Sequence, residues 1–330
     1  MKRIVVLHNA VPADAPPEDF DTLVQADAIM KAIGQLGHEP LRLSCTLDLS
    51  TMIAQLRRLR PDLVFNLVEA LADFDALAHL PIAVLEAFGI PHTGSSAESF
   101  FLTTHKVLAK RRLQLVGLPT PAWVEGPEDI DRRSQDLPAV GSWILKGVCD
   151  QGSRDMDDDA VLRDIGPTEL RERMTQRAAR SGRPCFAEQF IDGREFAIAM
   201  LAGPHGPETL PPSEIQFHDF PPGKPKIVGY RAKWIEGCFE YDQTPRHFTF
   251  ASGDAPLLNR LRDLATQCWA HFHLHGWARV DFRVDSFGNP WILEVNANPC
   301  LAPEAGFAMT LHETSLPFAD AIERILEDPV

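Results

Sequence analysis

The stretch "RVDFRVDSFGNPWILEVNANP", from Arg279 to Pro299, sets acids and amides into two strand-like apolar runs. The first run alternates charged residues with valine and phenylalanine, a period of two that is typical of a strand with one apolar face. The second run alternates in the same way, which predicts that Ile292, Glu294 and Asn296 share one face. The short segment "SFGNP" between the runs predicts a turn and therefore an antiparallel hairpin.

The polar faces of this hairpin predict a metal site. If the two faces coincide, Asp281, Glu294 and Asn296 come together, with Arg279 beside them. Three hard oxygen ligands without imidazole or thiolate suit Mg2+ or Mn2+ better than zinc, and magnesium suggests a phosphate-bearing substrate. The alternative is a surface hairpin on which Asp281 pairs with Arg279 or Arg283. The apolar packing around Glu294 favours the metal.

Composition narrows the class of protein. The 330 residues are 45% apolar and 24% charged, which is ordinary for a globular chain of about two domains. The net charge of -14 argues against nucleic acid or an anionic membrane as partner, since both attract cationic proteins. No apolar run reaches the roughly 18 residues of a membrane helix. Six cysteines without a C-x-x-C spacing indicate reduced thiols and a cytoplasmic protein.

Strands and helices alternate in the first 95 residues, which predicts a parallel sheet with helices on its faces. The pattern indicates strands at 3–7, 40–44 and 62–68, a helix that stops at Gly37, and a helix at 50–59 capped by Ser50 or Thr51. Neither G-x-G-x-x-G nor G-x-x-x-x-G-K-[ST] occurs, so the two best-known phosphate loops are absent from this sequence.

The later segments carry most of the candidate chemistry. A helix containing Lys106 and Lys110 precedes a strand at 142–148 and the acidic loop "CDQGSRDMDDDAV" at 149–161. A basic helix follows near 169–180. The runs at 185–191 and 195–201 are expected to pair as strands joined at Asp192-Gly193. A strand at 213–217, a helix at 255–271, the hairpin and a terminal helix from about residue 317 complete the pattern.

The hairpin resembles the terminal signature of ATP-grasp enzymes, and in particular the D-alanine:D-alanine ligase group. The likeness runs from Arg3 to the final helix. It implies an α/β chain, α+β overall, with the ATP-grasp fold: an amino-terminal parallel α/β domain and two α+β subdomains that clamp ATP. The implied boundaries are 1–95, 96–191 for the central lid domain, and 192–330 for the domain with the metal hairpin.

The resemblance also assigns roles to residues. Two magnesium or manganese ions would be held by Asp281, Glu294 and Asn296, and Arg279 would stabilise a tetrahedral intermediate. The remaining assignments are phosphate contacts by Lys106 and Lys146, a lid serine at Ser153, adenine contacts by Glu188, Gln189, Phe190 and Ile191, a ribose contact by Glu195, a phosphate-reaching loop lysine at Lys233, and a first-substrate contact by Glu18.

The implied function is ATP-dependent formation of an amide or peptide bond between small molecules through an acylphosphate, with loop 149–161 as a lid. A homodimer is also implied. Cys300 stands where the family has a glycine and Ala305 where it has a serine that grips the second D-alanine. We therefore expect an acceptor other than D-alanine, and Glu304 favours an amine-rich one. The alternatives are an ATP-binding regulatory protein without ligase activity and a small-molecule kinase.

Overall fold

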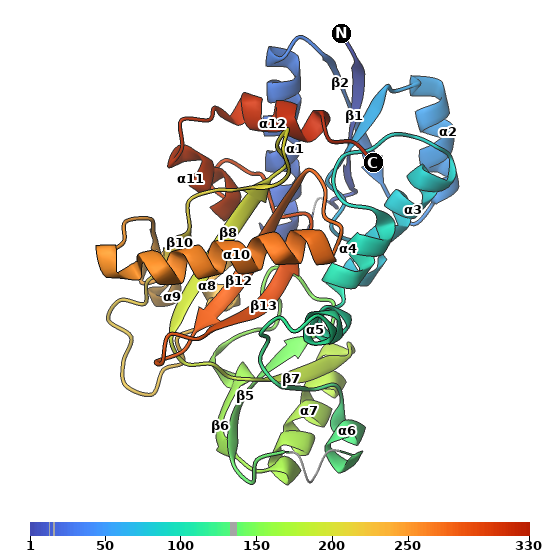
Figure 1. Cartoon of the computed structure of the whole chain (residues 1–330). Coiled ribbons are helices and arrows are strands. Elements are labelled where there is room, and N and C mark those ends of the chain that lie inside the picture. Colours follow the sequence, from blue (N-terminus) through green and yellow to red (C-terminus); the bar gives the residue numbers. More distant parts are fainter. Residues whose placement is uncertain (13, 16, 133–136) are drawn as a thin grey trace.

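The structure is a computed structural model that describes residues 1–12, 14–15, 17–132 and 137–330, with the backbone alone at 17–19. Three sheets succeed one another along the molecule (Figure 1). The amino-terminal part lies at one end, the largest sheet in the middle, and a smaller four-stranded sheet at the other end. No helix in the described ranges is long and apolar enough to cross a membrane.

The amino-terminal sheet has the order β2 (Glu39–Cys45), β1 (Arg3–Asn9), β3 (Leu63–Asn66), and all its pairings are parallel, as predicted. Helices α1 (Pro17–Gln35) and α2 (Leu49–Leu59) connect the strands. The predicted cap of α2 was wrong. Asp48 is the N-cap, and its carboxylate accepts the backbone N–H of Thr51 at 3.0 Å, because an aspartate before the first turn satisfies an otherwise free N–H.

The four-stranded sheet is antiparallel, with the order β4 (Trp123–Val124), β7 (Cys185–Gln189), β5 (Gly141–Gly147), β6 (Val161–Ile165). Helices α6 (Pro127–Arg132) and α7 (Pro167–Ser181) cover one face (Figure 1). Leu170 and Met174 from α7 pack with Leu145 in the apolar core that results.

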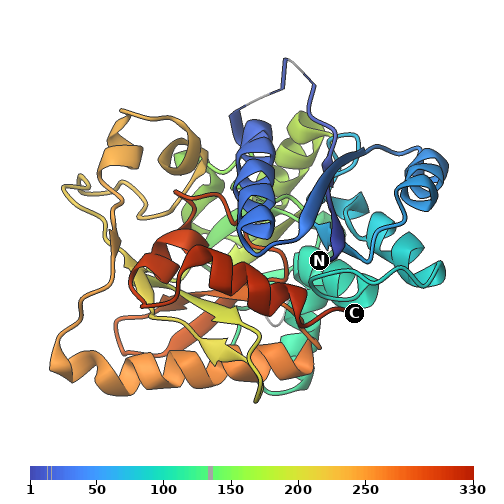
Figure 2. The same ribbon diagram turned by 90° about the horizontal axis from the view of Figure 1, so that it is seen from above.

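The large sheet has the order β11 (Arg246–His247), β10 (Ser213–Ile215), β8 (Arg194–Leu201), β12 (Trp277–Val284), β13 (Pro290–Asn296), and β9 (Glu208–Thr209) pairs with β8. Helix α10 (Ala255–His271) runs across one face (Figure 2). Leu261 of α10 packs there with Phe282 and Val295 of the hairpin, so this face is apolar and the opposite face is free to carry polar groups.

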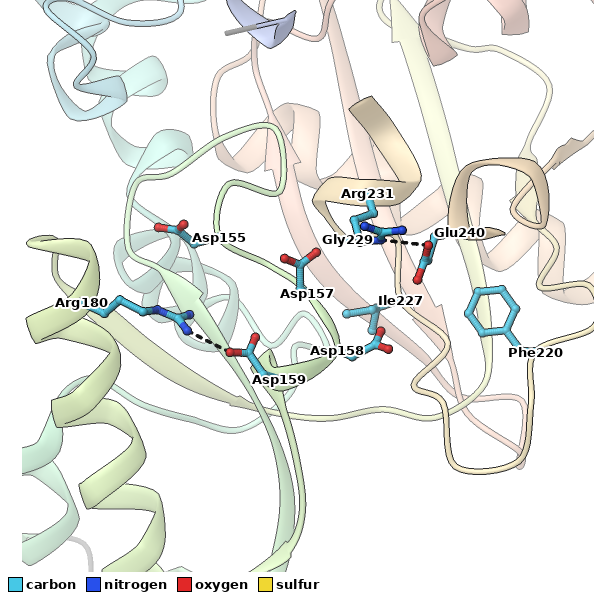
Figure 3. A pocket seen from close by; sticks show the side chains of 10 residues that line it. All are labelled: Asp155, Asp157, Asp158, Asp159, Arg180, Phe220, Ile227, Gly229, Arg231 and Glu240. Atoms are coloured by element: carbon cyan, nitrogen blue, oxygen red, sulfur yellow. Dashed lines mark hydrogen bonds and ion pairs between the residues drawn. The ribbon is translucent and has the colours of Figure 1, made fainter. Parts of the chain in front are cut away.

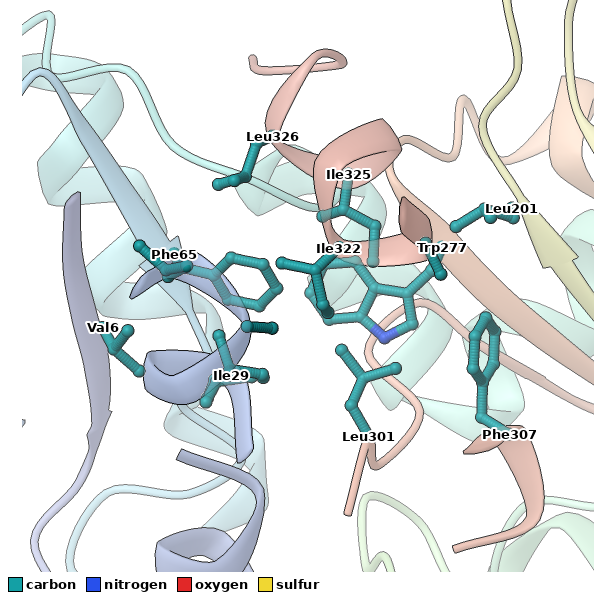
Figure 4. Packing of buried hydrophobic residues seen from close by; sticks show 14 of the residues in the cluster. Val6, Ile29, Phe65, Leu201, Trp277, Leu301, Phe307, Ile322, Ile325 and Leu326 are labelled. Carbon is teal, nitrogen blue, oxygen red and sulfur yellow. The ribbon is translucent and has the colours of Figure 1, made fainter. Parts of the chain in front are cut away.

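A second apolar core joins the large sheet to the amino-terminal part. Trp277 of β12 and Phe65 of β3 lie with ring centroids 5.5 Å apart, and Ile322 of α12 (Phe318–Leu326) packs against them (Figure 4). The remaining helices are α3 (His79–Ala87), α4 (Ala97–Thr104), α5 (Lys106–Leu115), α8 (Tyr230–Trp234), α9 (Phe239–Asp242) and α11 (Gly306–His312).

The expected pairing of the two strands around Asp192-Gly193 was wrong. Strand β7 pairs with β4 and β5, whereas β8 pairs with β10 and β12 in the large sheet. The apolar pattern identifies a strand but not its partner, and here the chain passes from one sheet to another within four residues. The three-part domain division at residues 95 and 191 stays a prediction.

Candidate active site

The hairpin brings the predicted metal ligands onto neighbouring strands. Asp281 lies directly opposite Glu294, and Arg279 lies opposite Asn296. The expected alternation along the second strand was partly wrong, because the register shifts between Asp281 and Phe282 and leaves Leu293 as an extra residue. Such a β-bulge turns the following side chains to the other face. Ile292 therefore joins the core with Val295 and does not share a face with Glu294.

Arg279 holds both carboxylate oxygens of Asp281. Arg279 Nε lies 2.7 Å from Oδ1 and Nη2 lies 2.8 Å from Oδ2. Burial opposes ionisation of Asp281, but the charge and hydrogen bonds of Arg279 lower its pKa below the ordinary aspartate value. The pairing considered for a surface hairpin thus exists, but at a half-buried position, where each side chain is only 21% exposed.

Glu294 and Asn296 complete the oxygen set. Glu294 Oε1 lies 3.3 Å from Lys106 Nζ, and this lysine also donates to the carbonyl of Asp150 at 2.7 Å. Asn296 Oδ1 accepts the backbone N–H of Asn298 at 2.9 Å and keeps a second lone pair. Two carboxylates and an amide oxygen beside three cationic side chains, Arg279, Lys106 and Lys233, fit a hard divalent cation bound together with phosphate.

Glu188 lies between two lysines at the start of this site. Lys146 Nζ donates to Glu188 Oε1 at 2.5 Å, and Lys110 pairs with the other oxygen. Glu188 and Lys110 are each only 1% exposed, and the two lysines keep the pKa of Glu188 low although burial opposes this. Sequence reasoning did not assign Lys110 to the site. Its position four residues after Lys106 on one helix face was the signal that could have identified it.

A cavity of about 60 Å3 lies between the four-stranded sheet and the large sheet. It is lined by Ile144, Lys146, Met156, Glu188, Gln189, Phe190, Ile191, Glu195, Ile227, Val228, Arg283 and Leu293. The structure therefore brings together Lys146, the four residues expected at adenine and Glu195. It also adds Arg283, which is 4% exposed and lies 2.7 Å from the Glu195 carboxylate. The sequence could not indicate Arg283, because its pattern is that of any charged strand residue.

The acidic loop lies closed over this cavity. Ser153 donates its hydroxyl hydrogen to the carbonyl of Val228 at 2.8 Å, and Trp234 donates its indole N–H to the carbonyl of Gly152 at 2.8 Å. On the other side, Arg154 and Arg183 both pair with Asp73 of the amino-terminal part, at 2.6 and 2.7 Å. Val228 and Trp234, which lie between β10 and β11, and Asp73 of the amino-terminal part thus hold the loop in place.

Lys233 of α8 faces the metal hairpin. Lys233 is exposed, but the protein around it desolvates its ammonium group, and this desolvation together with the charge of Arg279 lowers its pKa. Asp281 and Glu294 act in the opposite direction. The fold therefore places this predicted catalytic lysine in the same electrostatic field as Arg279 and the two acids.

A larger cavity of about 490 Å3 lies on the outer side of the loop (Figure 3). Asp155, Asp157, Asp158 and Asp159 point into it from one side, and Glu240 and Phe220 from the other. Burial, followed by the charge of Asp159, raises the pKa of Asp157. A concentration of negative charge repels a triphosphate, so the smaller cavity is the candidate nucleotide site.

Cys300 follows the hairpin at the boundary with the amino-terminal part. Its Sγ lies 2.8 Å from Asp21 Oδ2, and burial, Glu69 and Asp21 raise the pKa of the thiol well above its ordinary value. A protonated thiol is a poor nucleophile, so Cys300 is suited to shaping the site. The side chain of Glu18, the expected contact for the first substrate, lies outside the described part of the chain.

Comparison with known proteins gives the family. Residues 166–327 match the family model described as D-ala D-ala ligase C-terminus. The structure of D-alanine:D-alanine ligase from Bacillus anthracis with ATP superposes with a TM-score of 0.74, covering 99% of this chain and 97% of that one at 18% identity. Residues 166–327 thus carry the carboxy-terminal domain of the D-alanine:D-alanine ligase family, and the chain as a whole has the fold of that ligase. This confirms the family resemblance and the ATP-grasp fold expected from the hairpin.

Relatives of this ligase-like chain match along nearly its whole length. The D-alanine:D-alanine ligase of Gloeobacter violaceus is 29% identical over 345 residues, covering 98% of each chain. That of Synechococcus sp. (strain JA-3-3Ab) is 27% identical over 308 residues, covering 93% of this chain and 88% of the relative. An uncharacterized protein of Sinorhizobium fredii is 27% identical over 329 residues, with 96% and 90% coverage. The amino-terminal part is therefore shared as well.

Proposed function

We propose that this ATP-grasp protein joins a carboxylate to an amine with the energy of ATP, through an acylphosphate. The observation that carries the proposal is the pairing of Asp281 with Glu294 across one ribbon, beside Arg279 and Lys106. The cavity between the four-stranded and the large sheet adjoins the same hairpin, because Leu293 and Arg283 line it. The relatives named as D-alanine:D-alanine ligases support this class of reaction.

The nucleotide would lie between the four-stranded and the large sheet. Glu188, Gln189, Phe190 and Ile191 would surround the adenine, and Glu195 would accept hydrogen bonds from the ribose. Lys106, Lys146 and Ser153 would contact the phosphates. Lys146 donates a hydrogen bond to Glu188. When a nucleotide binds, the same ammonium group would donate to both the Glu188 carboxylate and a phosphate oxygen.

Asp281, Glu294 and Asn296 would hold the magnesium ions that accompany ATP. A bound divalent cation neutralises charge on the transferred phosphoryl group. Arg279 uses Nε and one N–H of Nη2 on Asp281, so its three remaining N–H groups would be available to the reacting groups. Lys233 would add a further positive charge near the same atoms.

The chemistry follows in two steps. A carboxylate oxygen of the first substrate, positioned by Glu18, attacks the γ-phosphorus, and the bond to ADP breaks. The amine of the second substrate then attacks the acyl carbon, a proton leaves the nitrogen, and phosphate departs with the former acyl oxygen. Arg279 and the backbone N–H of Cys300 would stabilise the intermediate oxyanion. The closed loop 149–161 would keep water from the acylphosphate.

The second substrate would differ from D-alanine. Ala305 offers no hydroxyl to an acceptor, and Cys300 replaces a glycine with a side chain that lies against Asp21. The shape and hydrogen bonding of the acceptor end therefore differ from the pattern on which the resemblance rests.

Phosphate and ADP release across a panel of amino acids and other amines tests the function. The proposal expects magnesium-dependent ADP formation that needs both a carboxylate and an amine. ADP formation without any amine would instead indicate a kinase, and nucleotide binding without turnover would indicate a regulatory protein. Strong selective turnover of D-alanine alone would refute the proposed change of acceptor.

A further inference from the structure

Arg246 is a half-buried cation that has no role in the chemistry proposed above. It lies in the edge strand β11, in one row across the sheet with Ile215, Glu195 and Arg283. Cross-strand neighbours share a face, so Arg246 is on the face that carries the candidate active site. Its Nη1 lies 3.3 Å from the hydroxyl oxygen of Ser213. No carboxylate in the described part of the chain lies within ion-pairing distance of it.

The guanidinium of Arg246 fills the space beside Gly306. A Cβ atom added at Gly306 would lie 2.7 Å from Nη2, 2.8 Å from Cζ and 3.1 Å from Nη1 of Arg246. The preceding residue, Ala305, contributes only a methyl group. Arg246 therefore supplies the charged hydrogen-bond donors nearest to this backbone, and a side chain at residue 306 would displace them.

The electrostatics of this position favour an anionic ligand. Burial, and then the positive charge of Arg279, lower the pKa of Arg246 to about 10, so it remains charged at neutral pH. Both oxygens of the nearby Asp281 are already held by Arg279. Even a half-buried guanidinium loses hydration that a close anion would offset, and its fork of donors matches a carboxylate. A bound anion would thus offset the desolvation cost of the Arg246 guanidinium, with which no carboxylate of the described chain forms an ion pair.

The position of Arg246 separates it from the expected phosphate contacts. Lys106 lies beside β13 at one side of the sheet, whereas Arg246 lies on β11, four strands away. At roughly 4.8 Å per strand the two ends are about 19 Å apart. Neither Arg246 nor Gly306 lines the nucleotide cavity.

We infer that Arg246 anchors a carboxylate carried by the amine substrate, and that Gly306 makes room for it. The inference rests on the proposed ligase function and adds that the acceptor is an amino acid or a similar compound with an acid group. Arg246 would thereby select the acceptor, whereas Arg279 acts on the reacting atoms.

Calorimetry tests this inference through binding, without requiring turnover. The probes are amino acids and their carboxamides, titrated into protein with and without magnesium and a non-hydrolysable ATP analogue. At least one amino acid should bind the wild type tighter than its carboxamide by about tenfold or more, as expected for a charged hydrogen-bonded pair. Arg246→Gln should weaken binding of the amino acid by about 10- to 100-fold. It should leave the affinities for the carboxamide and for the ATP analogue unchanged.

Two further variants separate a specific role from a general one. Gly306→Ala keeps the charge but displaces the guanidinium. It should therefore weaken binding of the amino acid and leave binding of its carboxamide unchanged. Arg260→Gln, at an exposed position of α10, should change neither. The inference is overturned if Arg246→Gln binds the amino acid as tightly as the wild type does, or if this variant loses affinity for the ATP analogue instead. It is also overturned if the wild type binds no amino acid more tightly than the corresponding carboxamide. Failure of the ligase proposal has a different outcome: the wild type would bind no ATP analogue in the presence of magnesium.

Discussion

Lys110 and Glu188 form an ion pair in the protein interior, with each side chain only 1% exposed. Lys110 comes from α5 and Glu188 from β7, so the pair ties a helix to the four-stranded sheet beside the cavity that Glu188 lines. Burial lowers the pKa of Lys110, and Glu188 opposes that shift. Both groups are costly to bury alone, which makes their mutual contact a condition for the local fold.

Lys110→Met should therefore destabilise the protein by about 3 kcal/mol, because Glu188 loses one of its two cations inside the protein. Chemical denaturation measures the change. Arg111→Met is the matched control, since Arg111 is the next residue of α5 but 53% exposed in its pair with Glu125; it should cost about 0–1 kcal/mol. Equal losses in the two variants would contradict the role given to Lys110.

Asp281→Asn should lower kcat/KM for magnesium-dependent phosphate release on the order of 100-fold, or ~2.7 kcal/mol in the barrier. The change removes a proposed metal ligand and the partner of Arg279. Asp285→Asn tests the hairpin itself. Asp285 accepts N–H groups of Phe287, Asn289 and Trp291, all within the hairpin, and asparagine keeps an acceptor oxygen. A similar loss in both variants would show that the ribbon, and not the carboxylate, is required.

Deprotonation of Lys233 should cause the fall of kcat/KM at alkaline pH, the alkaline limb of the pH profile. Its pKa is lowered, so it loses its proton at a lower pH than an ordinary lysine, and kcat/KM should fall as the pH rises through that pKa. Lys233→Arg keeps the charge to much higher pH and should move the limb upward. A limb that stays in place in this variant would exclude Lys233 as its origin.

Cys300 should react slowly with iodoacetamide. Burial, Glu69 and Asp21 raise its pKa, so little thiolate forms near pH 8. Mass spectrometry of peptides alkylated for increasing times compares it with Cys238, which is also half-buried and contacts the carbonyl of Arg231. Faster labelling of Cys300 than of Cys238 would restore it as a candidate nucleophile.

Asp73→Asn should loosen the loop over the nucleotide cavity. The substitution removes the negative charge that pairs with Arg154 of the loop and with Arg183, which in turn pairs with Asp150 of the loop. Hydrogen exchange of residues 149–157 should become several-fold faster. Asp27→Asn breaks the exposed pair with Arg42, far from the loop in the chain, and should leave that exchange unchanged. Unaltered exchange in Asp73→Asn would mean that Ser153 and Trp234 suffice to hold the loop.

The sequence by itself determined the strands, the long helices and the polar hairpin, because periods of 2.0 and 3.6 are local properties of the chain. It therefore predicted that Asp281 and Glu294 would meet. Only the tertiary structure decided which strands pair, as β7 and β8 show, and where the bulge at Leu293 falls. The same holds for Lys110 and Arg246. Their function depends on burial and on partners distant in sequence, Glu188 and Gly306, and a local pattern contains no information about either.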